Sequence, residues 1–496
     1  MADEAADVSN IEQMPLVIRF VDHSSIIREE FLGFVKYDEG ITGEAISKKI
    51  LGGIREYGLD MKYCRGQGYD GAGNMAGKCS GAAVRIQNEY PKAPYTHCGS
   101  HALNLCVASA CNIQEVRNMM SHVRVVSEFF NASPKRFAFL TKEIKNTEEI
   151  EEGRHTHLID VCRTRWIARI DGLDVFAEVF LAVVKCLEKI KLNVEGPWNT
   201  DSVRDASGLF HATISFQFIV CLIVVSRCLE ITRPLTKQLQ SATYDIVAAN
   251  ENVTLLYAAL RRARLEVSEK HAEWFEESTR LAQSVKVDAR KPRTVGRQVN
   301  RANTPADSIS QYYERTITIR FLDHLTWQIK ARFSERNMTV LNGFYAFPAR
   351  IVSSLEWRPK FESFLKDCSE DLPEARYLST ELSMWEDYWR SFQGTQPTTL
   401  SSLLPSINRI TFPNIFTAMQ ILATLPVTTC TCERSISVLR RLKTYLRNSM
   451  AEDRLNALAL IHVQREIKLE SQDIIDRFAL RHPRRMKLID ILNTDP

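Results

Sequence analysis

Three acidic residues that lie far apart along the chain could act together on a phosphate group. Asp3 is close to the N-terminus, Asp70 follows a predicted strand, and Glu433 lies at the start of a late helix within Cys430-Thr-Cys-Glu-Arg-Ser435. Carboxylates at strand ends can converge on two Mg²⁺ ions about 4 Å apart, which stabilise the attacking and leaving oxygens of a phosphoryl displacement. Spacing alone is weak evidence, because the chain has 60 Asp and Glu residues and most acidic trios are solvated surface charges.

The composition predicts a folded protein of two to four structural units. The chain has 496 residues, of which 45% are hydrophobic and 25% charged, values that exclude collagen-like, wholly disordered and small disulfide-scaffold classes. Its 64 Lys and Arg residues leave a net charge of only +4, so a nucleic-acid face would require local clustering of basic side chains. Twelve irregularly spaced cysteines and the lack of an apolar leader predict reduced thiols in an intracellular protein.

The elements that must position these acids are predicted from periodicity. The patterns predict an antiparallel hairpin (16–21 and 30–37), a helix (42–59), a strand (61–69), a small-residue turn (71–77), a helix (80–90), a strand (95–98) and a helix (101–111). From about 115 to 420 the chain reads almost wholly as helix. Its most apolar stretch, 214–225, is too short to span a bilayer and predicts a buried helix, so we expect no membrane association.

A basic segment interrupts the helical region. Residues 286–305 contain Arg290, Arg293 and Arg297 among prolines and a glycine, without apolar periodicity. This pattern is typical of an exposed loop, which serves either as a solvated linker or as a contact for phosphates.

Six short motifs in one order resemble the catalytic region of hAT-superfamily transposases. In particular, the chain resembles the domesticated group similar to the repressor of the inhibitor of the protein kinase and to MYM-type zinc-finger proteins. The motifs are residues 3–22, Gly66 to Gly77, His97 to Leu105, Cys162 to Trp166, Pro292 to Arg301 and Cys432 to Ser437.

The resemblance implies an α/β plus all-α architecture, in which an RNase H-like mixed sheet is interrupted by a large helical insertion domain. It implies that the core is built from residues 1–115 and 401–465, with the insertion at 116–400 and a C-terminal tail at 466–496. The region 401–465 would also contain a helical dimerisation region, so a homodimer or higher oligomer is the expected assembly.

The resemblance assigns the acidic triad to Asp3, Asp70 and Glu433, which would hold Mg²⁺ only if the protein is catalytically active; Asp7 is an alternative for the first position. Cys98 and His101 match the Cys-x-x-His motif of the family. Two ligands are too few for a zinc site, so we expect a packing and hydrogen-bonding role for this pair.

A nucleic-acid site is implied around Trp166. With Arg163 and Arg165, its indole could stack on an unpaired base beside phosphate-binding cations; read as a plain helix-face tryptophan, it would belong to the core.

Three departures from the family argue against catalysis. Only two residues precede Asp3, so the first strand is expected to be truncated and Asp3 poorly fixed. Ala5 and Ala6 stand where relatives often carry hydroxyl residues, and no Cys-x-x-Cys with a His pair, as in a zinc finger, occurs before residue 98. We therefore expect a degenerate or domesticated, dimerising nuclear protein with residual DNA binding. The alternatives are an active Mg²⁺-dependent transposase and a helical scaffold or transcriptional regulator that does not bind DNA.

Overall fold

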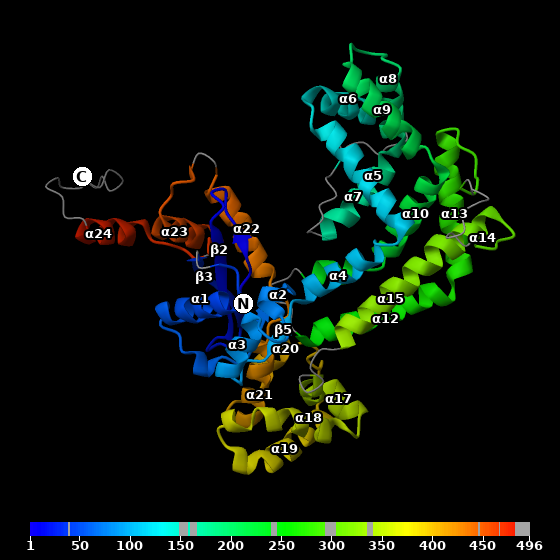
Figure 1. The fold of residues 1–496 in the computed structure, drawn as a ribbon. Coiled ribbons are helices and arrows are strands. Elements are labelled where there is room, and N and C mark those ends of the chain that lie inside the picture. Colours follow the sequence, from blue (N-terminus) through cyan, green and yellow to red (C-terminus); the bar gives the residue numbers. More distant parts are fainter. Residues whose placement is uncertain are drawn as a thin grey trace, which may run out of the picture.

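The chain is mostly helical and has two small sheets near its N-terminus. The computed structural model describes residues 1–37, 40–147, 157–158, 166–239, 246–292, 304–334, 341–444, 447–465 and 467–481. Figure 1 shows a sheet-containing part that includes both the first and the last helices, and a long helical part beside it. This arrangement agrees with the predicted order of an α/β segment, a helical region and a return of the chain.

The first sheet is the predicted hairpin with a short extra strand. β2 (Glu12–Val21) pairs antiparallel with β3 (Ile27–Tyr37), and β1 (Ala5–Ala6) pairs with the start of β2. Val17, Phe31 and Phe34 lie in one buried cluster. Phe31 and Phe34 are three residues apart, and the register shift at Leu16/Val17 lets both face the same side of the sheet. The hairpin prediction is confirmed, although both strands begin earlier in the sequence than their alternating patterns indicated.

The first residues of the chain are held on both sides. The Met1 ammonium donates to the carbonyl of Val17 at 2.7 Å, and the Val17 amide donates to the carbonyl of Met1 at 2.9 Å. Ala2 forms an antiparallel bridge with Leu16, and its amide donates to the carbonyl of Gly68 at 3.3 Å. The expectation that Asp3 is poorly fixed is therefore wrong, because main-chain hydrogen bonds hold the two residues that precede it.

The second sheet lies on the other side of these residues. β4 (Gln67–Tyr69) and β5 (Tyr95–His97) pair in parallel. The predicted strand over 61–69 is only partly right, because Asp60 accepts a hydrogen bond from the Lys62 amide and begins a 3-10 turn, η1 (Met61–Tyr63).

Three helices accompany these strands. Thr42 caps α1 (Gly43–Glu56) by accepting a hydrogen bond from the Ala45 amide, as the sequence predicted. The small-residue turn contains the four-residue helix α2 (Gly73–Ala76), and α3 (Ala82–Glu89) follows it.

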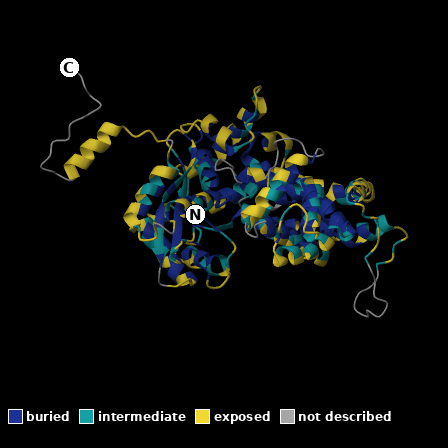
Figure 2. Ribbon diagram, turned by 90° about the horizontal axis from the view of Figure 1, so that it is seen from above, coloured by how far each residue is buried: buried dark blue, intermediate teal, exposed yellow. Residues whose placement is uncertain are grey.

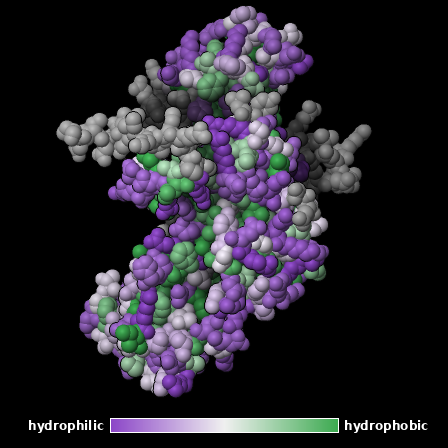
Figure 3. All heavy atoms as spheres, turned by 90° about the vertical axis from the view of Figure 1, so that its left-hand side faces the viewer, coloured by the Kyte–Doolittle hydropathy of each residue, from purple (hydrophilic) through white to green (hydrophobic). Residues whose placement is uncertain are grey.

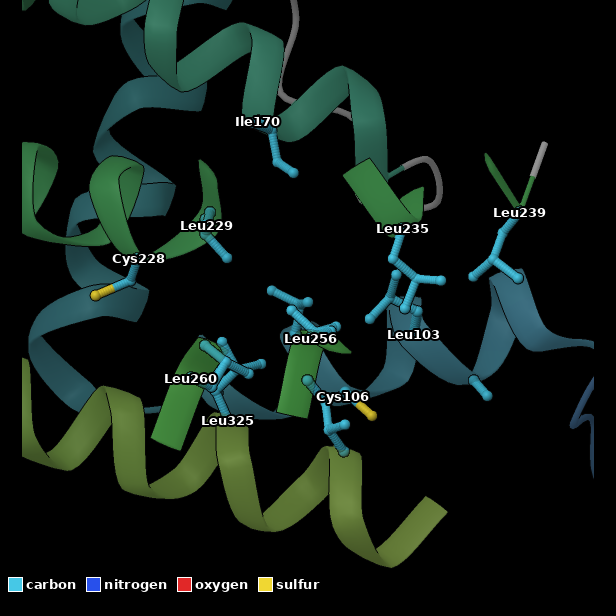
Figure 4. Close-up of a cluster of buried hydrophobic side chains, with 14 of the residues drawn as sticks. Leu103, Cys106, Ile170, Cys228, Leu229, Leu235, Leu239, Leu256, Leu260 and Leu325 are labelled. Atoms are coloured by element: carbon cyan, nitrogen blue, oxygen red, sulfur yellow. The ribbon is translucent and has the colours of Figure 1, made fainter. Parts of the chain in front are cut away.

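The helical part has one continuous hydrophobic core. In Figure 4, the labelled side chains converge on this core from six helices and from Leu239, which follows α11; all of the labelled residues are buried. The most apolar helix, α10 (Phe216–Glu230), has twelve buried residues, which confirms the prediction of a buried helix over 214–225. The helices are α4 (Gly99–Ala110), α5 (Gln114–Asn131), α6 (Pro134–Asn146), α7 (Trp166–Glu178), α8 (Phe180–Lys191), α9 (Thr200–Thr213), α10 (Phe216–Glu230), α11 (Arg233–Gln238), α12 (Ile246–Leu265), α13 (Val267–Ser284), α14 (Ile309–Tyr313) and α15 (Ile319–Ser334).

The chain then returns to the sheets. After α17 (Pro348–Ser353), α18 (Trp357–Asp367) and α19 (Leu378–Ser391) come α20 (Leu400–Leu403) and α21 (Pro413–Thr424). α22 (Cys430–Leu442) and α23 (Glu452–Val463) pack against the β2–β3 hairpin, and α24 (Ser471–Arg481) extends away from the body (Figure 1).

No single helix among the described residues is long and apolar enough to cross a membrane; only α9 and α10 together, bent by 67°, meet that criterion by length and composition.

A buried ion pair joins the start of the chain to its return. Lys443, which follows α22, donates to Asp7 Oδ2 at 2.5 Å, and both side chains are almost completely buried. Asp7 also accepts hydrogen bonds from the amides of Ser9 and Ile11. Although burial alone would raise it, these partners hold the pKa of Asp7 below its usual range. Asp7 is thus engaged in a structural contact, which leaves Asp3 as the candidate for the first acidic position.

The ion pair predicts a stability effect. Lys443→Met should destabilise the protein by about 3–5 kcal/mol, because it leaves the Asp7 carboxylate buried without its cation. The melting temperature followed by circular dichroism should fall, and the double variant Asp7→Asn with Lys443→Met should recover part of the loss. Equal melting temperatures for the wild type and Lys443→Met would contradict the proposed contribution of the pair.

Candidate functional site

Asp3 and Asp70 lie on neighbouring backbone segments. Asp3 follows Ala2, whose amide is hydrogen-bonded to β4, and Asp70 is the residue directly after β4. Both side chains are half-buried. The Asp70 carboxylate accepts a hydrogen bond from the Ala72 amide at 3.1 Å, which fixes it at the beginning of the small-residue turn.

Glu433 reaches the same place from the far end of the sequence. It lies in the first turn of α22, whose Cys432 packs in the cluster formed by Val17 and Phe31 of the hairpin. The hydroxyl of Thr431 donates to Glu29 of β3, and Glu29 is paired with Arg19 of β2 at 2.6 Å. These contacts fix the N-terminal turn of α22 against the sheet.

The electrostatics of Asp3 reflect this convergence. Burial is the main reason why the pKa of Asp3 rises to about 7, and the negative charges of Asp70, Glu433 and Glu4 raise it further. The hydrogen bond from the Glu4 amide, at 2.9 Å, opposes this rise. The structure therefore brings the three predicted acids within electrostatic range of one another.

The sequence prediction missed a fourth acid and its partner. Asn74 of α2 donates to both carboxylate oxygens of Glu4, at 3.1 and 3.0 Å, and so ties the N-terminal segment to the turn after Asp70. Burial raises the pKa of Glu4 above its usual value, and the charge of Asp70 adds to the increase. Glu4 is adjacent to Asp3, and Asn74 is the only amide side chain in the turn 71–77, so both positions were signalled in the sequence.

The acids have the chemistry of magnesium ligands but are not arranged as a finished metal site. Carboxylate oxygens are the ligands that Mg²⁺ prefers. Nevertheless, the part of the chain that the structure describes has no group of three or more His, Cys, Asp or Glu residues placed to hold a metal ion.

Cys98 makes contacts that hold the two ends of the chain together. Its buried sulfur accepts hydrogen bonds from the amide of His101, at 3.4 Å, and from the amide of Thr429, at 3.2 Å. The neighbouring Gly99 amide donates to the carbonyl of Val427 at 2.8 Å. The cysteine thus caps α4 and fixes the segment that leads into α22 and Glu433.

His101 lies next to the acidic centre, which is the name given to Asp3, Asp70 and Glu433. Its ring stacks on that of His97 with centroids 5.6 Å apart, and a Cβ atom at Gly71 would lie only 2.7 Å from His97 Cε1. Gly71 is therefore required for close packing directly after Asp70. Burial lowers the pKa of His101, although the charge of Asp70 opposes this effect.

Most of the residues that were predicted to bind nucleic acid lie outside the described residues. Arg163, Arg165, Arg293 and Arg297 lie outside the described residues, as does the side chain of Trp166, the first residue of α7. Arg290 is described, and its carbonyl accepts a hydrogen bond from the Tyr313 hydroxyl at 2.9 Å.

Comparisons with known proteins give one family match near each end of the chain. Residues 1–81 match the family described as the ZMYM1/FAM200 RNase-like domain, and residues 387–467 match the hAT family C-terminal dimerisation region. The chain is 30% identical over 482 residues to the human (Homo sapiens) "52 kDa repressor of the inhibitor of the protein kinase", and 30% identical over 483 residues to the mouse (Mus musculus) protein of that name. These alignments cover 96% of this chain but 63% of each relative, so the chain spans less than two thirds of their length.

The resemblance to hAT-derived proteins is therefore confirmed. The chain has an RNase-like segment at its N-terminus and a hAT-type dimerisation region near its C-terminus.

The raised pKa of Asp3 predicts how stability changes with pH. A carboxyl group whose pKa rises from 3.8 in the unfolded chain to about 7 in the folded one destabilises the fold as pH increases through that range, by at most about 4 kcal/mol. Asp3→Asn removes this charge, so its melting temperature should exceed that of the wild type by more at pH 8 than at pH 5.

The matched control is Asp201→Asn, which removes an acid from an exposed position of α9. It should change the melting temperature little at either pH. An Asp3→Asn protein that is no more stable than the wild type at pH 8 would show that burial and the neighbouring acids do not make the ionised Asp3 carboxylate unfavourable as described.

Proposed function

We propose that this chain functions as a homodimer, assembled through its C-terminal region, and acts in the nucleus through protein contacts and residual nucleic-acid affinity. The observation that carries this proposal is the match of residues 387–467 to the hAT dimerisation region. The matched relatives are named as repressors of an inhibitor of a protein kinase. A comparable regulatory role is consistent with a protein that acts by contact with partners.

The C-terminal helices have apolar side chains that are largely exposed. Ile461 on α23 is 60% exposed, and Ile474 and Phe478 on α24 are each about half exposed. Ile474 and Phe478 are four residues apart, so they lie on the same face of the helix. Figure 2 shows α24 as an exposed helix that projects from the body.

The side of the molecule from which α24 projects is mixed in polarity. In the face shown in Figure 3, hydrophilic side chains predominate and hydrophobic ones form scattered patches. A homodimer that buries the exposed faces of α23 and α24 would remove these apolar groups from water, which favours association.

A second proposal concerns the fold and the acidic centre. Residues 1–6 lie between the two sheets and form hydrogen bonds to both. The segments therefore follow one another in the order β3, β2, residues 1–6, β4 and β5, and β4 and β5 are parallel. This order, the acids on two adjacent segments and the third acid after a helical insertion support an RNase H-like core. Asp3, Asp70 and Glu433 are the residues that we propose as its acidic triad.

We derive no strand-cleavage step from this centre. The donor chemistry suits Mg²⁺, but the described residues do not present a finished ligand set. The main-chain hydrogen bonds of Met1 and Ala2 nevertheless remove one reason for expecting inactivity, namely a loose first strand. The acidic centre is therefore proposed as a preserved feature of the transposase-derived core.

The dimer predicts that charge on the apolar face of α24 weakens association. The double variant Ile474→Asp with Phe478→Asp should shift the protein from dimer toward monomer at micromolar concentration, because both carboxylates would have to be buried in the interface. Multi-angle light scattering measures the change.

The control is Leu355→Asp, which places a charge on a side chain that is 93% exposed outside the C-terminal region. This variant should remain dimeric. A wild-type protein that is monomeric at every concentration would overturn the proposal, and a double variant that stays dimeric would exclude this face of α24 from the interface.

The basic segment predicts salt-dependent nucleic-acid binding. Reversing the charge of Arg290, Arg293 and Arg297 to Glu should weaken binding to a labelled duplex and make the plot of log affinity against log salt shallower by about 2–3, since up to three phosphate contacts are lost. Fluorescence anisotropy at several salt concentrations measures both effects. Charge reversal of the exposed Arg204 on α9 is the control, and unchanged binding by the triple variant would remove this segment from the proposal.

A further inference from the structure

A cavity in the helical part lies apart from the acidic centre. It has a volume of about 1100 Å³ and is lined by residues of α7, α10 and α13, together with Arg233 of α11. None of the described residues that line it is Asp3, Asp70 or Glu433. This cavity is large enough for a small organic ligand or a short extended side chain.

The cavity has a surplus of negative charge. Among the described residues, five carboxylates and three guanidinium groups line it, which gives them a net charge of −2 (three positive minus five negative). The acids are Asp171, Asp174, Glu178, Glu230 and Glu277, and the arginines are Arg227, Arg233 and Arg280.

Two of the arginines are already shared between pairs of acids. Arg227 donates to Glu230 at 2.6 Å and to Glu277 at 2.5 and 3.0 Å. Arg233 donates to Asp171 at 2.8 Å and also to Asp174. Each of these guanidinium groups therefore faces two carboxylates, so the pairs leave negative charge uncompensated.

The surplus of negative charge contributes to a raised pKa of Asp174. Burial is the main reason why its pKa rises to about 6, and the charges of Glu230 and Asp171 add to the increase, while Arg233 and Arg227 oppose it. A further cation in the cavity would stabilise the ionised carboxylate.

A buried hydroxyl lies beside these charges. Ser226 of α10 is only 4% exposed, it lines the cavity, and its Oγ has no hydrogen-bond partner among the described residues. An unsatisfied buried hydroxyl is costly, so its presence at a cavity wall indicates a group that completes it. Val175, Ile223 and Leu281 supply apolar wall next to the polar groups.

We propose that this cavity binds an alkyl cation, with its ammonium or guanidinium group among the carboxylates and its methylene stem against the apolar wall. In the proposed complex the Ser226 side chain turns so that its Oγ, which has less than 1 Å² of accessible surface in the free protein, accepts a hydrogen bond from an N–H group of the ligand. Other N–H groups of the ligand donate to Asp174 and its neighbours. The cation comes either from a free polyamine or from a lysine or arginine side chain of a partner polypeptide.

Isothermal titration calorimetry with the full chain tests the proposal. The probes are spermidine and an acetylated, amidated peptide Gly-Gly-Arg-Gly-Gly, each titrated at low and at physiological salt. Saturable binding of at least one probe that weakens as salt rises is expected, and the probe that binds more tightly identifies the source of the cation.

Two variants localise the binding. Asp174→Asn should weaken it by about 10-fold or more, because a charge-assisted hydrogen bond is lost. Ser226→Ala keeps the charges and removes only the hydroxyl, so it should weaken binding by about 3- to 10-fold. Circular dichroism melting verifies that each variant is folded.

Asp201→Asn is the control, because it removes the same charge from an exposed site outside the cavity. It should leave the affinity unchanged. The proposal is overturned if neither probe binds saturably at low salt, or if folded Asp174→Asn and Ser226→Ala proteins bind as tightly as the wild type.

Discussion

The main-chain hydrogen bonds of the first two residues determine much of the arrangement of the core. Met1 exchanges hydrogen bonds with Val17 of β2, and Ala2 donates to Gly68 of β4. A segment with hydrogen-bonding partners on both sides cannot shift by one residue without losing them and turning its side chains to the other face. This constraint places Asp3 beside Asp70 and joins the two small sheets of the N-terminal region.

The return of the chain is fixed by a different set of contacts. The Cys98 sulfur accepts from the amide of Thr429, Thr431 donates to Glu29, and Lys443 pairs with Asp7. Each contact joins residues more than 300 positions apart, and all three involve buried or half-buried groups whose loss would leave an unsatisfied polar atom. The large helical part can therefore be inserted between the two halves of the core without separating Glu433 from the sheet.

The two acidic clusters have different relations to positive charge. Around Asp3 the partners are amides and other acids, and burial together with like-charge repulsion raises its pKa. In the helical cavity, two arginines are each shared between two carboxylates, and the surplus charge falls on Asp174. In both places desolvation is the largest single effect, because a half-buried carboxylate loses water that its neighbours replace incompletely.

The sequence by itself determined the local elements and the family. Alternation predicted the β2–β3 hairpin, the Thr42 cap predicted the start of α1, and the ordered motifs predicted the hAT resemblance. It could not predict that Asp3 is held firmly, since the hydrogen bonds of Met1 and Ala2 are made to residues 16 and 66 positions away. Nor could it reveal the Glu4–Asn74 contact, the Asp7–Lys443 pair or the cavity lined by Asp174 and Ser226. These features were decided by tertiary structure, because burial and the proximity of charges depend on which distant segments pack together, and periodicity along the chain does not contain that information.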